Sequence, residues 1–554
     1  MSDKRGFDPV TGAWNDSLAG DLLWSRNNFG EARPDVMSPF TYSISEKVWG
    51  EISPLPGYQL SGNICGRYYA NVSFSLSMLT ALGKSKEAAI GQMRDLLGSV
   101  PPDLEIPTVP LSRWTMLRAL PNMIKLGFQE KGGAKGVPQF LASNAADCRA
   151  LRRQIRETHS KAALLALWEN EIAPRLIDGV WLLGGATQPL EATRPLRDKL
   201  VGLVGEADAN ALFSNLSQQG SDPGPENGAG PGAGLLASLG PVVGVARVVQ
   251  GRMSRAEYLE TYGHRGPHEA ELSMPRPAED PAWLDRLLAE YAQDPVDVDD
   301  LLARRRAEFE AAWQRLEGRH PRQAQKLRRE IDKIGPAARQ REAVRDELTR
   351  FLWVERAWAL QAGELSGLGD DVFLLTLDEI YDLLSSRDTA TEYLPARRET
   401  YARYRALPAY PMLVRGPFDP FRWAADPQRR SDLYDATAAA PASNSGTIEG
   451  FAGAAGRVEG RVRVLDGPEE GDRLQRGEIL VAVTTNVGWT PLFPRAAAVV
   501  TDVGAPLSHA AIVARELGIP AVVGCGSATT RLHTGDRVRV DGGRGVVEIL
   551  GVSS

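Results

Sequence analysis

The sequence predicts a multidomain protein in which a large, mainly α-helical domain precedes a small α/β domain. From about residue 20 to residue 430, apolar residues recur at helical spacing. After about residue 446, short β-branched segments alternate with glycine and aspartate turns. The length of 554 residues exceeds one ordinary hydrophobic core, so it indicates two or three domains.

Amphipathic helices account for most of the first domain, which we assign to residues 1–434. The predicted helices have apolar residues on one face and cover 72–97, 164–178, 283–293, 298–316, 339–362 and 377–385. Within this domain, a stretch rich in glycine and proline at 220–234 is too poor in apolar residues to fold, and it predicts a mobile loop.

A second run of small residues, 435–446, separates the two domains. Its alanine, serine, asparagine and glycine content is typical of a flexible tether. The residues that follow, 447–554, form the predicted α/β domain.

The composition argues against several classes of protein. No apolar run reaches the roughly 18 residues that a membrane-spanning helix needs, and the first residues lack the apolar core of a signal peptide. Cys65, Cys148 and Cys525 are widely separated, which favours a reducing cytoplasm over a disulfide scaffold or a zinc cluster. The formal net charge of −6 gives no electrostatic case for nucleic acid.

The most informative residue is His509, at the predicted start of a helix. A β-branched strand at 496–501 precedes it, Ser508 is a natural N-cap, and apolar residues at 510–517 have helical spacing. Free backbone N–H groups and the helix dipole favour a bound anion at this position. A neutral imidazole is also a nucleophile, so His509 suits covalent phosphoryl transfer. The alternative is a histidine that only caps or packs the helix.

The block around His509 resembles the phosphohistidine, or swivelling, domain of the phosphoenolpyruvate (PEP)-utilising enzymes, which include PEP synthase and rifampin (rifampicin) phosphotransferase. Their signature is Thr-x-x-Gly-Gly-x-x-Ser-His-x-Ala-x-x-Ala-Arg-x-x-Gly-x-Pro. The chain matches it at Thr501, Gly504, Ser508, His509, Ala511, Ala514, Arg515, Gly518 and Pro520. It departs at Ala505, where the family has a second glycine. The resemblance covers about 446–550.

This resemblance implies that His509 carries a covalent phosphoryl group. The residues expected to bind its phosphate are Thr484, Thr485, Gly504, Ser508 and Arg515. For the two threonines and the arginine, a structural role is the alternative.

A second group of reactive side chains, with two histidines, an arginine and two glutamates, lies at 262–273. This segment resembles a Tyr-Gly-x-Arg-x-x-x-Glu segment of the same family. Arg265 is a candidate clamp for phosphoryl oxygens, with His268, Glu269 or Glu271 as the base. The alternative is a polar turn whose residues bind one another. Because Gly266 and Pro267 break any helix between His264 and His268, we expect no metal site there.

Two further segments of the first domain, 24–41 and 363–381, resemble the acceptor domain of rifampin phosphotransferase-like proteins. No Walker-type glycine loop and no ATP-grasp-like segment is recognised. The resemblance therefore implies a separate ATP-grasp partner that binds ATP and Mg²⁺ and phosphorylates His509, a division of labour similar to that of phenylphosphate synthase. The tether then lets the small domain visit both sites.

The expected acceptor is a small molecule with a hydroxyl or carboxylate group, such as a natural product. One alternative is that phosphorylation only activates the substrate for dehydration, cyclisation or ligation. Another is a non-catalytic phosphocarrier or ligand-binding protein, which the large size of the helical domain disfavours.

Overall fold

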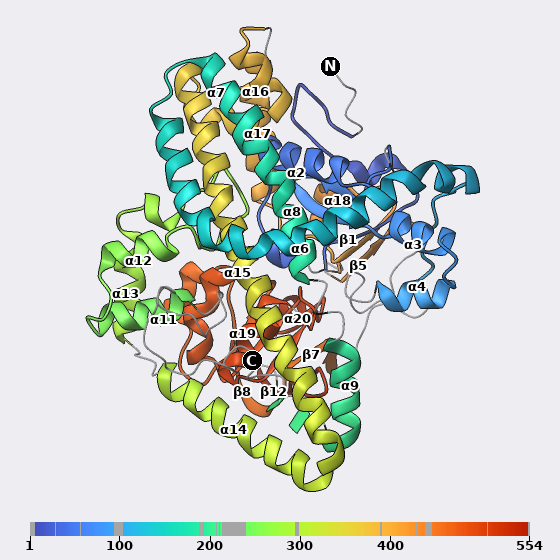
Figure 1. Cartoon of the computed structure of the whole chain (residues 1–554), viewed down its shortest axis with the longest axis vertical. Helices are drawn as coiled ribbons and strands as arrows, with labels where there is room; N and C mark the ends of the chain where they lie inside the picture. Colours follow the sequence, from blue (N-terminus) through green and yellow to red (C-terminus); the bar gives the residue numbers. More distant parts are fainter. Residues whose placement is uncertain are drawn as a thin grey trace.

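The computed structural model agrees with the predicted fold class, a mostly helical N-terminal domain followed by a mixed α/β domain (Figure 1). It describes residues 6–27, 29–55, 57–93, 104–187, 190, 193–205, 208–209, 211–212, 240–293, 298–387, 390–426, 429–430, 432–437, 446–506 and 508–551. The predicted loop at 220–234 and most of the predicted tether, 438–445, lie outside these residues.

The helical domain contains helices that range from one turn to more than forty residues. They are α1 (Phe29–Ala32), α2 (Pro39–Glu51), α3 (Val72–Ala81), α4 (Lys86–Gln92), α6 (Arg113–Arg156), α7 (Lys161–Leu167), α8 (Ala173–Thr187), α9 (Thr193–Val204), α11 (Gly240–Val249), α12 (Arg255–Tyr262), α13 (Trp283–Gln293), α14 (Val298–Arg319), α15 (Pro321–Ser366), α16 (Leu377–Leu384), α17 (Leu394–Arg405) and α18 (Pro420–Ala425). No described helix is both long enough and apolar enough to cross a membrane.

Three long helices, α6, α8 and α15, pack on one another and form the frame of this domain. A Cβ at Gly133 of α6 would lie 2.1 Å from the backbone oxygen of Trp181 in α8, so only glycine permits this close approach. At one end of the frame Trp358 of α15 meets Trp168 and Phe40, with ring centroids 4.5 and 6.2 Å away. These rings belong to the largest core cluster, so the tryptophans here serve packing.

The helix predictions hold where the apolar periodicity is strong. The helix at 283–293 is α13, and those at 298–316, 339–362 and 377–385 fall in α14, α15 and α16. The helix predicted at 72–97 was wrong in its length, because α3 ends at Ala81 and a new helix begins after Gly83, whose φ is +92°. The helix at 164–178 includes a π-turn at Trp168–Ile172.

The helical domain also contains a five-stranded sheet that the sequence did not predict. Its order is β2 (Ser61–Ile64), β3 (Arg67–Asn71), β1 (Leu23–Ser25), β4 (Leu413–Arg415) and β5 (Leu433–Asp435). Antiparallel pairing of β1 with β4 joins the two ends of the domain. These strands have only three to five residues, too few for a clear alternating pattern. The sheet fixes the chain that leaves β1 and enters α1.

The C-terminal domain is built on an eight-stranded sheet. Its order is β6 (Thr447–Glu449), β13 (Val546–Gly551), β12 (Arg537–Asp541), β8 (Arg457–Val464), β9 (Ile479–Ala482), β10 (Ala498–Thr501), β11 (Ala521–Val523) and β7 (Phe451–Ala454). The central strands β8, β9, β10 and β11 are parallel, and α19 (His509–Leu517) connects β10 to β11. A short helix, α20 (Ala528–Arg531), follows β11.

The C-terminal domain lies against the helical domain. Figure 1 shows it alongside α15, with α11 and α14 around it. Helix α14 contacts α19, and α11 contacts the 3₁₀ turns at Val487–Arg495. The start of α19 is therefore placed at the boundary between the two domains.

Candidate functional site

His509 is the first residue of α19. The hydroxyl of Ser508, the N-cap, accepts a hydrogen bond of 3.3 Å from the amide of Ala511. The loop before it turns at Gly504, whose φ is +147°. A Cβ at Gly504 would lie 3.1 Å from Ser508 Oγ, so glycine leaves room beside the cap. Gly504 and Ser508 are thus placed where the sequence predicts a phosphate loop.

The imidazole of His509 is buried, with only 3% of the residue exposed. Its Nε2 lies 3.3 Å from Thr490 Oγ1, and Phe493 packs edge-on against the ring. Burial, together with nearby Arg345 and Arg265, holds the pKa of His509 well below its ordinary value. The ring is therefore neutral at pH 7 and keeps a lone pair for phosphoryl transfer.

Several threonine hydroxyls are buried in the C-terminal domain. The hydroxyls of Thr484, Thr485 and Thr501 have no hydrogen-bond partner among the described residues. Buried hydroxyls usually have a partner, so these groups are available to a ligand. Sequence reasoning assigned no role to Thr490, because nothing in the spacing shows that the 3₁₀ turns at 487–495 return to the histidine.

The helical domain contacts the C-terminal domain near His509 at three points. Glu31 Oε1 of α1 accepts a hydrogen bond of 2.9 Å from the amide of Ala510. The side-chain amide of Asn486 donates a hydrogen bond to the carbonyl oxygen of Pro267. A Cβ at Gly488 would lie 2.8 Å from both the Cβ and the backbone nitrogen of Pro267. The histidine is thus enclosed between the two domains.

Glu31 occupies the end of α19 at which an anion is favoured. It is 3% exposed, and burial raises the pKa of its carboxyl to about 7, against the opposing effects of Arg345 and the α19 amides. Glu31 lies in the segment 24–41 that resembles the family's acceptor domain. However, sequence reasoning did not identify it, because 478 positions separate it from His509 in a chain of 554 residues.

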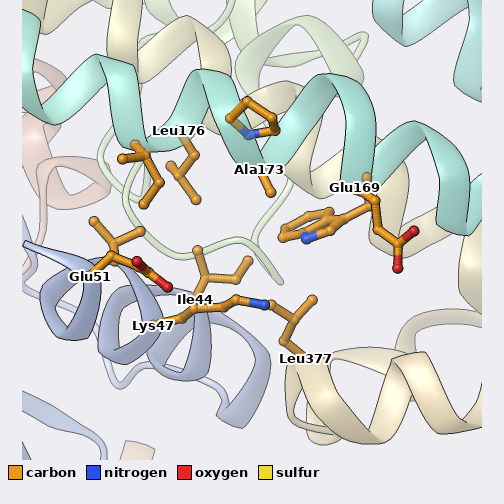
Figure 2. Close-up of a pocket in the computed structure, with 11 residues that line it drawn as sticks. Ile44, Lys47, Glu51, Glu169, Ala173, Leu176 and Leu377 are labelled. Atoms are coloured by element: carbon orange, nitrogen blue, oxygen red, sulfur yellow. The ribbon is translucent and has the colours of Figure 1, made fainter.

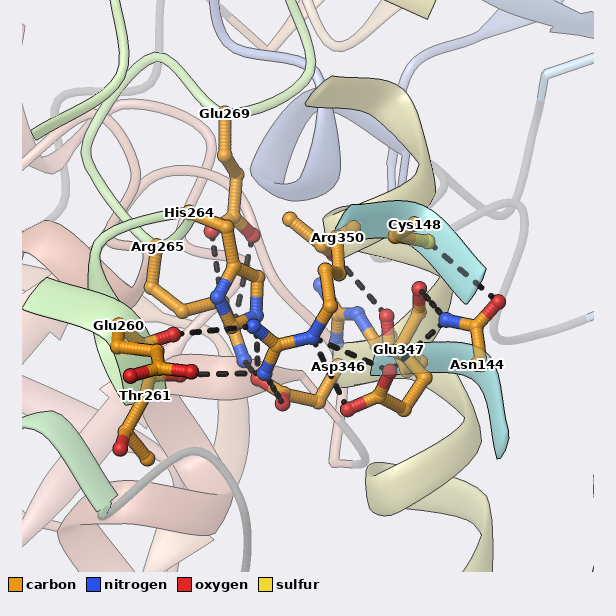
Figure 3. Close-up of polar contacts among 12 residues, drawn as sticks. Asn144, Cys148, Glu260, Thr261, His264, Arg265, Glu269, Asp346, Glu347 and Arg350 are labelled. Carbon is orange, nitrogen blue, oxygen red and sulfur yellow. Dashed lines mark hydrogen bonds and ion pairs between the residues drawn. The ribbon is translucent and has the colours of Figure 1, made fainter. Parts of the chain in front are cut away.

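Arg265 belongs to a buried network of ion pairs that includes Asp346 of α15 (Figure 3). Its Nε donates to Glu269 Oε2 at 2.8 Å, and its Nη1 donates to Asp346. Burial opposes the charge of Arg265, but Glu269 and Asp346 raise its pKa above the ordinary value. Glu269 is therefore paired with the predicted clamp, and Arg265 still acts electrostatically on His509.

Asp346 holds this network together. His264 Nε2 lies 3.3 Å and Arg350 Nη2 lies 3.9 Å from its carboxylate. Burial favours the neutral acid, but His264 and Arg265 hold the pKa of Asp346 below its ordinary value. The fixed negative charge positions Arg265.

His268 and Glu271 have different surroundings. His268 Nδ1 lies 2.8 Å from Asp35 Oδ1, and this hydrogen bond raises the pKa of His268. Glu469 of the C-terminal domain also acts on the ring, so His268 lies at the domain boundary. Glu271 instead accepts hydrogen bonds from Ser38 and Thr41 at the start of α2. The structure thus gives Glu271 a capping role.

Arg515 braces the loop before His509. Its Nη2 donates to the carbonyl oxygens of Gly453 at 2.7 Å and Pro506 at 2.9 Å. This is the structural alternative considered for this residue, and phosphate binding by Arg515 stays a prediction. Among the described residues, no group of three or more histidine, cysteine, aspartate or glutamate side chains is arranged to hold a metal ion.

An apolar groove lies elsewhere on the helical domain, between α2, α8 and α16 (Figure 2). It has a volume of about 220 Å³ and is lined mainly by Ile44, Val48, Trp168, Leu176 and Leu377. None of the predicted site residues lines it.

Comparison with known families agrees with this division of the chain. Residues 474–545 match the model of the PEP-utilising enzyme mobile domain, which includes His509. Residues 243–346 match the model of the rifampicin phosphotransferase fourth domain, which includes Arg265. The chain combines these two domains. The resemblance predicted from the sequence is thereby confirmed for these two parts of the chain.

Three relatives show the extent of the similarity. An uncharacterised protein of Mycobacterium tuberculosis is 36% identical over 308 residues, which cover 53% of this chain and 31% of the relative. Rifampicin phosphotransferase of Streptomyces sviceus is 31% identical over 312 residues, with coverages of 53% and 34%. The prodigiosin synthesizing transferase PigC of Serratia marcescens is 33% identical over 307 residues, with coverages of 53% and 33%. The aligned part thus spans about a third of each relative.

Proposed function

We propose that this protein is a phosphotransferase in which His509 carries a phosphoryl group from a separate ATP-grasp-type partner to a small-molecule acceptor. The observation that supports this most strongly is the enclosure of a neutral His509 between the domains. Glu31 contacts the start of α19 from the helical domain, and Arg265 and Arg345 act on the imidazole. Acid–base and phosphate-stabilising groups therefore come from one domain and the nucleophile from the other.

Recharging His509 requires the two domains to separate. The docked ring is 3% exposed, so a second protein cannot reach it in this arrangement. The C-terminal domain must move away to meet ATP and Mg²⁺, which we assign to the partner. The predicted tether at 435–446 gives the chain the freedom to do so.

Transfer to an acceptor hydroxyl breaks the N–P bond of phosphohistidine and forms an O–P bond. The acceptor proton moves to the Glu31 carboxylate, and the imidazole nitrogen takes the electron pair of the N–P bond. Because the other ring nitrogen keeps its proton, the histidine leaves as neutral imidazole. Arg265 and Arg345 stabilise the charge on the transferring oxygens. If the acceptor is a carboxylate, no proton has to be removed. The pKa of about 7 for Glu31 suits a group that takes and returns a proton.

A second candidate is transient activation, in which the phosphate leaves again during ligation or cyclisation. The name of one relative, a prodigiosin synthesizing transferase, favours this possibility because it describes synthesis of a product. The two candidates share the phosphohistidine and differ in whether the final product contains phosphate.

The test is the intact mass of the protein with Mg²⁺ and ATP, alone and with a candidate ATP-grasp protein, at neutral or alkaline pH. We expect an acid-labile gain of one phosphoryl group that requires the partner and is absent in His509→Ala. A gain that persists in His509→Ala, or no gain with any partner tried, contradicts the proposal. Mass analysis of acceptor products then separates the two candidates.

A further inference from the structure

Two arginines of the five-stranded sheet region, Arg26 and Arg67, have buried guanidinium nitrogens without a hydrogen-bond partner among the described residues. Arg26 follows β1 and is 2% exposed, and its Nε and Nη1 have no hydrogen-bond partner among the described residues. Arg67 begins β3, its Nη1 donates to the carbonyl oxygen of Pro34, and its guanidinium lies over the ring of Tyr410, but its Nε is buried without a partner. Guanidinium nitrogens left unpaired in a protein interior are costly, so they are commonly found where an anion binds.

The two arginines come from adjoining strands: Arg26 follows Ser25, which pairs with Ala70 of β3, and Arg67 is the first residue of β3. Burial lowers the pKa of Arg67 to about 10, and the neighbouring charge of Arg26 acts in the same direction. The groups that act on Arg67 include one carboxylate, Asp35, whose Oδ1 lies 2.8 Å from His268 Nδ1. The other oxygen, Asp35 Oδ2, is buried without a partner among the described residues. The cluster therefore has excess positive charge and one free acceptor.

This cluster adjoins the proposed reaction site. A Cβ at Gly30 would lie 2.8 Å from Arg26 Nε and 3.3 Å from Val503 Cγ1 in the C-terminal domain. The next residue, Glu31, binds the amide of Ala510. Arg26 thus borders the loop that leads to His509.

The cations that influence His509 are Arg345 and Arg265. An anion held by Arg26 and Arg67 would therefore lie beside the loop that precedes His509, next to the cations that act on the imidazole.

We propose that Arg26 and Arg67 bind an anionic group of the acceptor, a carboxylate or a phosphate ester, while Asp35 accepts a hydrogen bond from an acceptor hydroxyl. The acceptor class is then a small hydroxy acid or a phosphorylated alcohol. This inference rests on the proposed function, which supplies the reaction at His509.

Binding of small anions tests the proposal without any phosphoryl transfer. Isothermal titration calorimetry with the full chain would compare malonate, its neutral analogue malonamide, and inorganic phosphate. We expect malonate or phosphate to bind and malonamide not to bind. Arg26→Gln and Arg67→Gln should each weaken anion binding by about tenfold or more, because a charge-assisted pair is lost. Preference for malonate or phosphate identifies the acceptor anion as carboxylate or phosphate ester.

Two control variants make the test specific. Arg398→Gln removes an exposed arginine that pairs with Asp371, and it should leave binding unchanged. His509→Ala should also retain binding, because the anion lies outside the phosphohistidine site. The proposal is overturned if neither anion binds, if Arg26→Gln binds as tightly as the unaltered protein, or if His509→Ala alone abolishes binding. In that last case the anion occupies the start of α19.

Thermal unfolding without added anions provides a second measurement. Arg26→Met replaces an incompletely paired buried cation by an apolar side chain of similar length, so the melting temperature should stay the same or rise. A fall of several degrees would show that Arg26 is structural and would overturn the assignment. Phosphorylation of His509 is measured separately by mass, so a failure of the proposed function is distinguishable from a failure of this inference.

Discussion

The carboxylate of Glu31 accepts a hydrogen bond of 2.9 Å from the amide of Ala510, one residue after His509. An acidic side chain of the helical domain thus takes the position at the α19 N-terminus where a phosphoryl oxygen is favoured. A phosphoryl group on His509 would compete with Glu31 for the Ala510 amide, so the carboxylate has to leave this amide when the phosphorylated domain docks. Under the proposed function, the docked arrangement therefore corresponds to the domain without a phosphoryl group on His509.

Replacement of Glu31 by glutamine should separate the two halves of the reaction. In Glu31→Gln the side-chain amide oxygen still accepts from Ala510, so docking is retained, but the side chain no longer takes a proton. We expect phosphorylation of His509 by the partner to be unchanged and transfer to a hydroxyl acceptor to fall by about 100-fold or more. Single-turnover transfer from the phosphorylated protein measures this. Equal loss in both half-reactions would mean that Glu31 has only a structural role.

Glu31 should also make stability depend on pH. Its pKa is raised from an ordinary 4.5 to about 7 by burial, so between these values the folded protein binds a proton that the unfolded chain releases. The free energy of unfolding therefore falls as pH rises from about 4.5 to 7, by at most about 3 kcal/mol for this group. In Glu31→Gln the decline should be smaller, as measured by chemical denaturation at several pH values. An identical pH slope in both proteins contradicts the assignment.

Arg345 should influence His509 through its charge. The side chain lies on α15 and, with burial and Arg265, lowers the pKa of His509. In Arg345→Gln we expect that pKa to rise, as followed by NMR titration of the imidazole. Transfer should fall by about 100-fold because one cation on the phosphoryl oxygens is lost. Arg328→Gln, on the same helix but paired with Asp332, is the matched control. An unchanged His509 pKa would exclude Arg345 from the site.

The sequence predicted the parts of this site that depend on local structure. Ser508 caps α19, His509 is its first residue, and the turn at Gly504 precedes them. Each of these features follows from residues only a few positions apart, because caps and turns are local. The apolar periodicity of α13 and α14 was likewise sufficient to predict these two helices, because it is also a local property of the sequence.

Features that arise from contacts distant in sequence could not be predicted. Glu31 reaches α19 only because the short strands β1 and β4 pair and fix the chain before α1. Helix α6 contains Pro121, Pro138 and several glycines, so local propensity argues against it. Close packing on α8 and α15 stabilises it instead. The roles of Glu269 and Glu271 also depended on partners that spacing does not show.

The docked arrangement itself can be tested at Gly488. A Cβ there would lie 2.8 Å from Pro267 of the helical domain, but the φ of Gly488 is not in the left-handed region, so a larger residue suits its own domain. Gly488→Val should therefore prevent docking without unfolding the C-terminal domain. We expect phosphorylation of His509 by the partner to be retained, since the histidine is more accessible, and transfer to the acceptor to fall by about tenfold or more. Gly551→Val is the matched control, because no atom lies within 4 Å of a Cβ at that position. Undiminished transfer in Gly488→Val would show that this interface is not the one used for the reaction.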